Sequence, residues 1–262
     1  MKIIGHRGAA GLALENTLPG IELARLLGVD AIEIDVRKTK DNQLILCHDA
    51  DLKRVAGVSY RVAEHTLKEL QGIVLNDGQS FIPTLHQALQ TCAPTPVIID
   101  IKAKDCAKEL CAVLSEFPKL DVTVASFNFG TLRELRETRD NEKYTHYFKI
   151  YALEGTKPVE TIHRIKKARF DGIGINFWLL NPLTNLLIRR ANLEAYAFTV
   201  NSRIMAKFIQ LLYPRVAICS DRPELFIKHP WLKVRTGPAF KPTRLNKQHS
   251  ILRYDRTKIT KD

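Results

Sequence analysis

Short hydrophobic runs rich in β-branched residues alternate along this chain with longer stretches whose apolar residues recur at helical spacing. Short runs of the first kind are typical of buried strands, whereas apolar residues three and four positions apart are typical of amphipathic helices. The pattern predicts eight strands, at residues 2–6, 31–37, 96–102, 122–126, 145–151, 172–176, 195–200 and 216–220. It predicts helices at residues 18–28, 84–92, 105–117, 129–139, 157–169, 182–192, 202–212 and 222–228.

Eight alternating units favour an α/β fold of the TIM (β/α)8 barrel type, in which the strands are parallel and the helices cover the outside. An open, doubly wound parallel sheet produces a similar alternation, and periodicity alone does not separate the two folds. The number and spacing of the units favour the closed barrel. We therefore expect one barrel domain over residues 1–228.

Residues 39–82 depart from this alternation. Residues 40–43, Lys-Asp-Asn-Gln, have the composition of a hairpin turn, and residues 44–48 would return from it as a short strand. Residues 50–82 show little periodicity apart from one short predicted helix near residues 67–70. We expect a small insertion after strand 2, at about residues 50–82, on a face of the barrel where it can help to build a pocket.

Composition and charge narrow the class of protein. The chain has 262 residues, of which 45% are hydrophobic, enough for one large core. Its five cysteines form no CxxC pair, which argues against a disulfide framework and a cysteine-rich zinc site. No signal peptide pattern and no long apolar run is present, so we expect a cytoplasmic protein.

The formal net charge of +12 is concentrated at one end of the chain. Residues 229–262 contain nine Lys or Arg and only two Asp, together with three Pro that discourage a continuous helix. We interpret this basic C-terminal extension either as a solvated tail or as a peripheral attachment to an anionic membrane. No nucleic acid partner is expected, because no recognised nucleic-acid-binding module accompanies the charge.

Carboxylates interrupt two of the predicted strands. Strand alternation places Glu33 and Asp35 on one face and the apolar residues between them on the other, and Asp100 shares a face with Lys102 in the same way. A half-exposed strand would explain the first pattern, and a buried ion pair would explain the second. In a parallel barrel both faces are covered, so three inward carboxylates would need a cation. Their oxygens suit Mg²⁺ or Ca²⁺ better than zinc.

Two histidines also stand at strand ends. His6 follows the first strand and is followed by Arg7-Gly8, and His48 ends the return of the hairpin. A single histidine at such a place is more often structural than catalytic. Two of them beside an acidic, metal-like set favour an acid/base pair.

The ordered set of motifs resembles the glycerophosphodiester phosphodiesterase family over about residues 2–228. The motifs that carry the resemblance are His6-Arg7-Gly8, Glu15-Asn16-Thr17, Glu33-Ile34-Asp35, His48-Asp49, Pro83-Thr84-Leu85, Asp100-Ile101-Lys102, Ser126-Phe127 and Ser220-Asp221-Arg222-Pro223. Each motif is weak alone, but their order and spacing together are specific.

This resemblance implies hydrolysis of glycerophosphodiesters to sn-glycerol 3-phosphate and an alcohol, with one divalent cation, in glycerophospholipid degradation. By the same resemblance His6 and His48 are the general acid/base pair. The metal ligands are Glu33, Asp35 and Asp100, and the substrate-binding residues are Arg7, Lys102, Asn16 and Phe198. The family usually has Glu in place of Asp100, and often Trp in place of Phe198. Asp100 is therefore one methylene shorter than the usual ligand, and Phe198 would reshape the alcohol pocket.

Two further functions stay open at this point. The first is a lysophospholipase D-like enzyme at a membrane surface, which an apolar pocket built by the insertion and Phe198 would favour. The second is a non-catalytic phosphodiester-binding protein on the same barrel, because a fold does not fix a function.

Overall fold

The computed structural model describes residues 1–140 and 146–227 and shows eight parallel strands closed into a ring. The order around the ring is β1, β9, β8, β7, β6, β5, β4 and β2, with β2 pairing back to β1. The barrel strands are β1 (Ile3–Gly5), β2 (Ala31–Lys38), β4 (Val97–Ile101), β5 (Val122–Ser126), β6 (Lys149–Glu154), β7 (Gly172–Asn176), β8 (Glu194–Phe198) and β9 (Ala217–Ser220).

Closure of the ring confirms the predicted TIM barrel and excludes the open sheet. Ile4 of β1 pairs with Ala31 of β2 on one side and with Cys219 of β9 on the other, so the first strand joins both ends of the sheet. An open sheet would leave an edge strand at this point.

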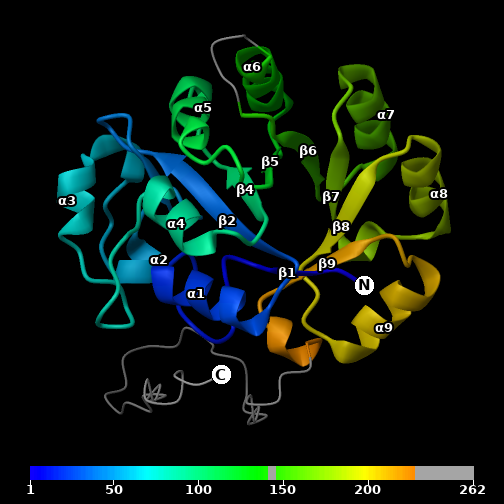
Figure 1. Ribbon diagram of the computed structural model, residues 1–262, viewed down its shortest axis with the longest axis horizontal. Coiled ribbons are helices and arrows are strands. Elements are labelled where there is room, and N and C mark those ends of the chain that lie inside the picture. Colours follow the sequence, from blue (N-terminus) through cyan, green and yellow to red (C-terminus); the bar gives the residue numbers. More distant parts are fainter. Residues whose placement is uncertain (141–145, 228–262) are drawn as a thin grey trace.

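Seven helices that cover the barrel wall (Figure 1) have bounds close to the predicted ones. They are α1 (Leu18–Leu27), α4 (Leu85–Cys92), α5 (Ala107–Ser115), α6 (Phe129–Arg139), α7 (Pro158–Ala168), α8 (Pro182–Arg190) and α9 (Arg203–Leu212). Local signals fix their starts. Thr17 accepts a hydrogen bond from the Gly20 amide at the start of α1, and Thr84 forms a capping box at the start of α4.

Two elements differ from the prediction. The strand expected at 145–151 is β6 at Lys149–Glu154, because its register is set by β5, where Ser126 pairs with Ala152. The helix expected at 222–228 is a single 3₁₀ turn, η3 (Pro223–Leu225). Phe226 and Ile227 follow it and pack against the apolar cluster beneath α9, and residue 228 lies outside the described residues.

The excursion after β2 builds a small core of its own. The predicted hairpin is present, with β3 (Leu44–Leu46) antiparallel to β2. Three short elements follow: α2 (Lys53–Ala56), η1 (Val62–Glu64) and α3 (Leu67–Gln71). They bury an apolar cluster that includes Ile45, Leu52 and Leu70. The excursion lies on the opposite side of the barrel from α8 and α9 (Figure 1).

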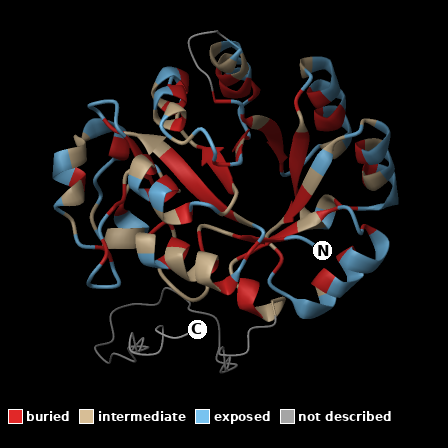
Figure 2. Ribbon diagram, viewed as in Figure 1, coloured by how far each residue is buried: buried red, intermediate tan, exposed pale blue. Residues whose placement is uncertain are grey.

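The main core fills the layer between strands and helices, and a smaller cluster that includes Ile98, Tyr151 and Tyr196 fills the barrel interior. The strands are mostly buried, whereas the outer helix faces are exposed (Figure 2). All five cysteines are buried and free. Among the described helices, none has the length and apolarity that crossing a bilayer requires. The basic extension at 229–262 lies outside the described residues.

Candidate active site

Three buried carboxylates meet at the carboxyl ends of neighbouring strands. Glu33 and Asp35 project from β2, and Asp100 projects from β4 at the position that pairs with Asp35. One oxygen from each lies within 4.8 Å of the others, and all three residues are almost fully buried. Strand alternation therefore brings together the three residues that the sequence marks as metal ligands.

Burial and neighbouring charges drive the pKa values of these acids apart. Burial, reinforced by the charge of Asp35, raises the pKa of Glu33. Burial also raises the pKa of Asp100 to about 6, although Lys102 opposes it. For Asp35 burial acts in the same direction, but Arg7 and Lys102 outweigh it and hold the pKa below its usual value. When ionised, the three carboxylates thus carry more negative charge than the neighbouring cations neutralise.

The cluster fits a divalent cation. Oδ1 of Asp100 is buried and has no hydrogen-bond partner, although such atoms are nearly always paired. Three carboxylates that share one small volume repel one another unless a cation lies between them. Hard oxygen donors with open positions beside them are the usual ligands of Mg²⁺ and Ca²⁺. Asp100 also reaches the cluster despite its shorter side chain.

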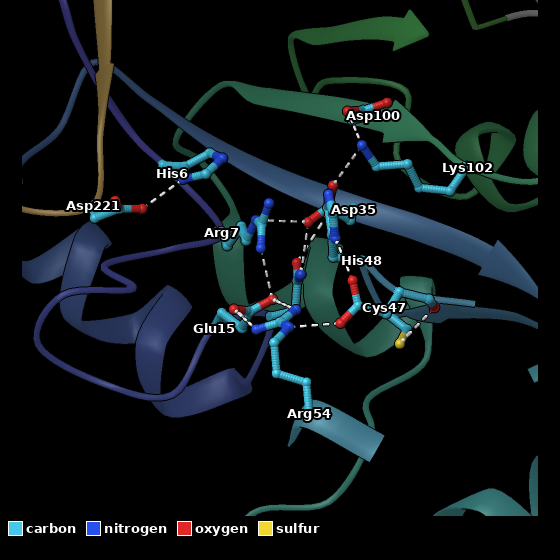
Figure 3. A network of polar contacts seen from close by, with 12 residues as sticks. His6, Arg7, Glu15, Asp35, Cys47, His48, Arg54, Asp100, Lys102 and Asp221 are labelled. Atoms are coloured by element: carbon cyan, nitrogen blue, oxygen red, sulfur yellow. Dashed lines mark hydrogen bonds and ion pairs between the residues drawn. The ribbon is translucent and has the colours of Figure 1, made fainter. Parts of the chain in front are cut away.

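Two cations border the carboxylates. Nε of Arg7 lies 3.1 Å from Oδ2 of Asp35, while the Arg7 Nη1 donates to Glu15 at 2.9 Å. Nζ of Lys102 lies 2.6 Å from Oδ2 of Asp100 and 3.3 Å from Oδ1 of Asp35. Two of the predicted substrate-binding residues, Arg7 and Lys102, therefore stand at the edge of the acidic cluster, with Asp35 between them (Figure 3).

Asn16 fixes Asp35 in place. Its Nδ2 donates to Oδ2 of Asp35 at 2.8 Å, and its Oδ1 accepts from the Asp35 amide at 3.0 Å. Asn16 is buried and has a positive φ of 54°, which Asn tolerates better than most residues. Asn16 therefore touches the cluster through Asp35, and it orients Asp35 as a candidate metal ligand.

His6 follows β1 and approaches the cluster from the side. Its Nδ1 lies 2.5 Å from Oδ1 of Asp221, and its Nε2 lies 3.9 Å from Oε2 of Glu33. Burial lowers the pKa of His6, but Glu33 and the hydrogen bond to Asp221 outweigh it, so that the pKa is raised. Asp221 is held in turn by Asn201, whose Nδ2 donates to it at 2.7 Å.

His48 follows β3 on the other side of Asp35. Its Nδ1 lies 2.7 Å from Oδ1 of Asp49, and its carbonyl oxygen accepts two hydrogen bonds from Arg37. Burial lowers the pKa of His48, and the opposing effects of Asp35 and Asp49 do not restore it. Each histidine thus has Nδ1 engaged by a carboxylate, which leaves Nε2 for proton transfer.

Sequence reasoning did not assign roles to the residues that brace these histidines. Arg54 of α2 donates through Nε to Asp49 at 2.6 Å and through Nη2 to Glu15 at 2.8 Å. It connects the support of His48 to the support of Arg7 (Figure 3). Asp49 and Asp221 could have been found from the sequence, because each lies within one of the motifs that carry the family resemblance. No sequence pattern points to Arg54, since its partners are five and thirty-nine residues away.

Phe198 lies at the end of β8, across the barrel mouth from the carboxylates. Its ring meets Phe127 edge to face at 6.2 Å, and Nζ of Lys102 lies 5.6 Å from the centre of the Phe127 ring. Phe127 is half-exposed and follows β5. An aromatic wall therefore begins directly beside one of the site's cations.

Comparison with known proteins gives consistent matches. The family model described as "Glycerophosphoryl diester phosphodiesterase family" matches residues 6–225. A glycerophosphodiester phosphodiesterase of Bacillus subtilis is 38% identical over 254 residues, which cover 86% of this chain and 85% of that protein. Human lysophospholipase D is 34% identical over 116 residues, and these cover 40% of this chain but only 37% of the human protein.

A solved structure shows the same fold. It is that of an Oleispira antarctica phosphodiesterase in complex with the product sn-glycerol-3-phosphate. It superposes with a TM-score of 0.76 at 24% identity, covering 86% of this chain and 94% of that one.

Proposed function

This chain belongs to the glycerophosphoryl diester phosphodiesterase family, and from that premise we propose that it hydrolyses glycerophosphodiesters to sn-glycerol 3-phosphate and an alcohol. The observation that carries the proposal is the arrangement of two histidines, each braced by a carboxylate, on either side of three buried acids. This arrangement provides a proton donor, a proton acceptor and a cation site at one end of the barrel.

In the first step His48 acts as the base. Its lowered pKa keeps the ring neutral near pH 7, so Nε2 can take the proton from the glycerol hydroxyl next to the phosphodiester. The alkoxide oxygen forms a bond to phosphorus, and the bond between phosphorus and the leaving alcohol oxygen breaks. His6 donates a proton to that oxygen, which gives a cyclic glycerophosphate and the free alcohol.

In the second step the two histidines exchange roles. His6 removes a proton from water, the water oxygen bonds to phosphorus, and the ring P–O bond breaks. His48 returns its proton to the ring oxygen, which yields sn-glycerol 3-phosphate and restores both side chains. Asp221 and Asp49 hold the two imidazoles in the tautomer and orientation that these transfers need.

The remaining polar residues of the site would stabilise negative charge on the substrate or hold the residues that do so. A divalent cation held by Glu33, Asp35 and Asp100 would stabilise the negative charge that develops on the phosphoryl oxygens. Arg7 and Lys102 lie at the border of that cluster, where they can hold phosphoryl oxygens during both steps. Asn16 keeps Asp35 oriented toward the cluster.

A lysophospholipase D activity on the same site is the second candidate. Phe127 and Phe198 place an apolar wall beside Lys102, where an acylated substrate could lay its chain. The match to human lysophospholipase D supports this candidate over part of that protein's length. Cytoplasmic glycerophospholipid degradation is the setting in which we expect either activity.

Product release from a substrate panel tests the proposal. Purified protein would be incubated with glycerophosphocholine, glycerophosphoethanolamine and lysophosphatidylcholine, with Mg²⁺ or Ca²⁺ present. We expect release of glycerol 3-phosphate from the first two substrates. Release from lysophosphatidylcholine alone would favour the second candidate. Binding without product from any substrate would overturn the enzymatic proposal in favour of a phosphodiester-binding protein.

A further inference from the structure

Several large apolar side chains are exposed where the elements after β6, β7 and β8 begin, and others follow along α8 and α9. Trp178, in the 3₁₀ turn η2 (Phe177–Leu179) that follows β7, is 75% exposed. Ile204, at the start of α9, is 83% exposed. Leu183 and Val159, at the starts of α8 and α7, are at least half-exposed. A soluble surface rarely concentrates side chains of this size in one region.

Their positions in the chain place them at one level of the barrel. Val159, Leu183 and Ile204 are each the second residue of the helix that follows a barrel strand. In a parallel barrel these helices all begin at the carboxyl ends of the strands, so the three side chains lie at one level. Trp178, in the turn after β7, lies at the same end, and we call these four residues the arc. Among the described helices, α1, α4, α5 and α6 have Pro, His, Lys and Gly at the same position. The arc is therefore confined to three consecutive units.

The charges around the arc are mainly positive. Residues 177–184 contain no ionisable side chain, and residues 202–208 contain Arg203 and Lys207 without an acid. At the start of α7 the exposed Lys157 faces Glu160, which balances it. Apolar side chains flanked by cations are the composition that binds the interface of an anionic bilayer.

The arc is also continuous with the candidate active site. Trp178 follows β7 and Phe198 ends β8, and these strands pair at Asn176 and Phe198. Phe198 contacts Phe127, whose ring lies beneath Lys102. A surface docked on the arc would therefore face the mouth from which phosphodiesters reach the cations.

We propose that this arc, formed by Val159, Trp178, Leu183 and Ile204, docks the protein on an anionic lipid bilayer with the barrel mouth toward the lipid. The docking does not rest on the proposed hydrolysis. It also differs from attachment through the basic extension, because insertion of apolar side chains persists at high salt, where the attraction between cations and anionic lipid is screened.

The chain offers a matched control for this proposal. Leu211 lies on the same outward stripe of α9 as Ile204 and is 79% exposed, but it is in the last turn, about 10 Å further from the mouth. An aspartate at either position adds the same charge to the same helix. A difference between the two variants reports the place of docking rather than general hydrophobicity.

Sedimentation with phosphatidylcholine/phosphatidylglycerol vesicles, at low and high salt, measures the binding. We expect Ile204→Asp to weaken partitioning roughly tenfold, the usual cost of keeping a large apolar side chain out of lipid. Leu183→Asp should act in the same direction, and Leu211→Asp should have little effect. Circular dichroism reports intact folding of all three variants. Turnover of glycerophosphocholine should also be unchanged in them, because the three positions lie outside the site.

Fluorescence gives a second readout. Trp178 and Trp231 are the two tryptophans of the chain, so Trp231→Phe leaves Trp178 as the reporter. We expect its emission to shift to shorter wavelength when vesicles are added. The proposal is overturned if the full chain does not sediment with vesicles, if Leu211→Asp weakens binding as much as Ile204→Asp, or if binding occurs without a shift of Trp178.

Discussion

The two sides of the barrel mouth use buried acids in opposite ways. At the end of β4, Asp100 is buried with Oδ1 unpartnered, and its pKa is raised to about 6. At the end of β6, Glu154 is equally buried, but it accepts from the amides of Thr156 and Lys157 and from the Thr161 hydroxyl. Burial raises the pKa of Glu154 less than these hydrogen bonds lower it.

This difference separates an acid whose partners lie within the chain from one that lacks a partner for one oxygen. Glu154 has its partners within the chain and closes the start of α7, so it needs no ligand. Asp100 shares its volume with two other acids and lacks partners for one oxygen, so it is suited to a ligand from outside. We therefore expect the chemistry on the side built from β1, β2 and β4, and packing and an apolar rim on the side built from β5 to β8.

The largest expected effect on turnover comes from the two histidines beside the acidic cluster, on what we call the polar side of the mouth. His6→Ala or His48→Ala should lower turnover of a glycerophosphodiester by a factor on the order of 10²–10⁴, because each removes a proton-transfer group. Steady-state assays with glycerophosphocholine measure this effect, with circular dichroism to verify folding. Wild-type turnover in both variants would show that the polar side is not the catalytic one.

A smaller effect is expected at Arg54, which lies on the excursion rather than on the barrel. Arg54→Ala removes the bridge between Asp49 and Glu15. We expect kcat to fall roughly tenfold, equivalent to about 1.4 kcal/mol in the barrier, with less change in KM. Arg54→Lys keeps the positive charge but not the forked guanidinium group that bridges two carboxylates, so it should recover only part of the rate. Full recovery by Lys would mean that charge alone matters.

The pH profile sharpens the role of Asp49. His48 must be neutral to act as a base, and its pKa lies below the usual 6.5, so kcat/KM should rise with pH and level off below neutrality. The hydrogen bond to Asp49 opposes the lowering caused by burial. Asp49→Asn should therefore move the acidic limb to lower pH. A limb that moves to higher pH would contradict the assignment of His48 as the base.

The smallest effect on activity is expected at Glu154, on the side of the mouth built from β5 to β8. Glu154→Ala leaves the buried Thr161 hydroxyl without its acceptor and should cost about 1–3 kcal/mol of stability. Because folding lowers the pKa of Glu154, its contribution is present above its unfolded pKa and is lost as pH falls through the folded one. Urea unfolding at pH 7 and pH 3 measures this. If Glu154→Ala lost as much turnover per folded molecule as His48→Ala, the proposed difference between the two sides would be wrong.

The sequence predicts the strands and the inward acids because both depend on local periodicity. Glu33 and Asp35 share a face whatever the rest of the chain does, and β4 follows the same rule. Closure of the barrel is not local, and it alone brings β9 beside β1, where Gly5 pairs with Ser220. The contact of His6 with Asp221 follows from that closure. The bridge made by Arg54 depends on how the excursion folds over the mouth, which periodicity does not specify.

Cation dependence tests the central claim most directly. After chelation of the purified protein, turnover of glycerophosphocholine would be measured while Mg²⁺ or Ca²⁺ is titrated back, for the wild type, Asp100→Asn and Glu154→Gln. We expect that chelation abolishes turnover, that a cation restores it, and that Asp100→Asn alone needs a higher cation concentration. Full turnover in the chelated wild type, or an unchanged cation requirement in Asp100→Asn, would contradict it.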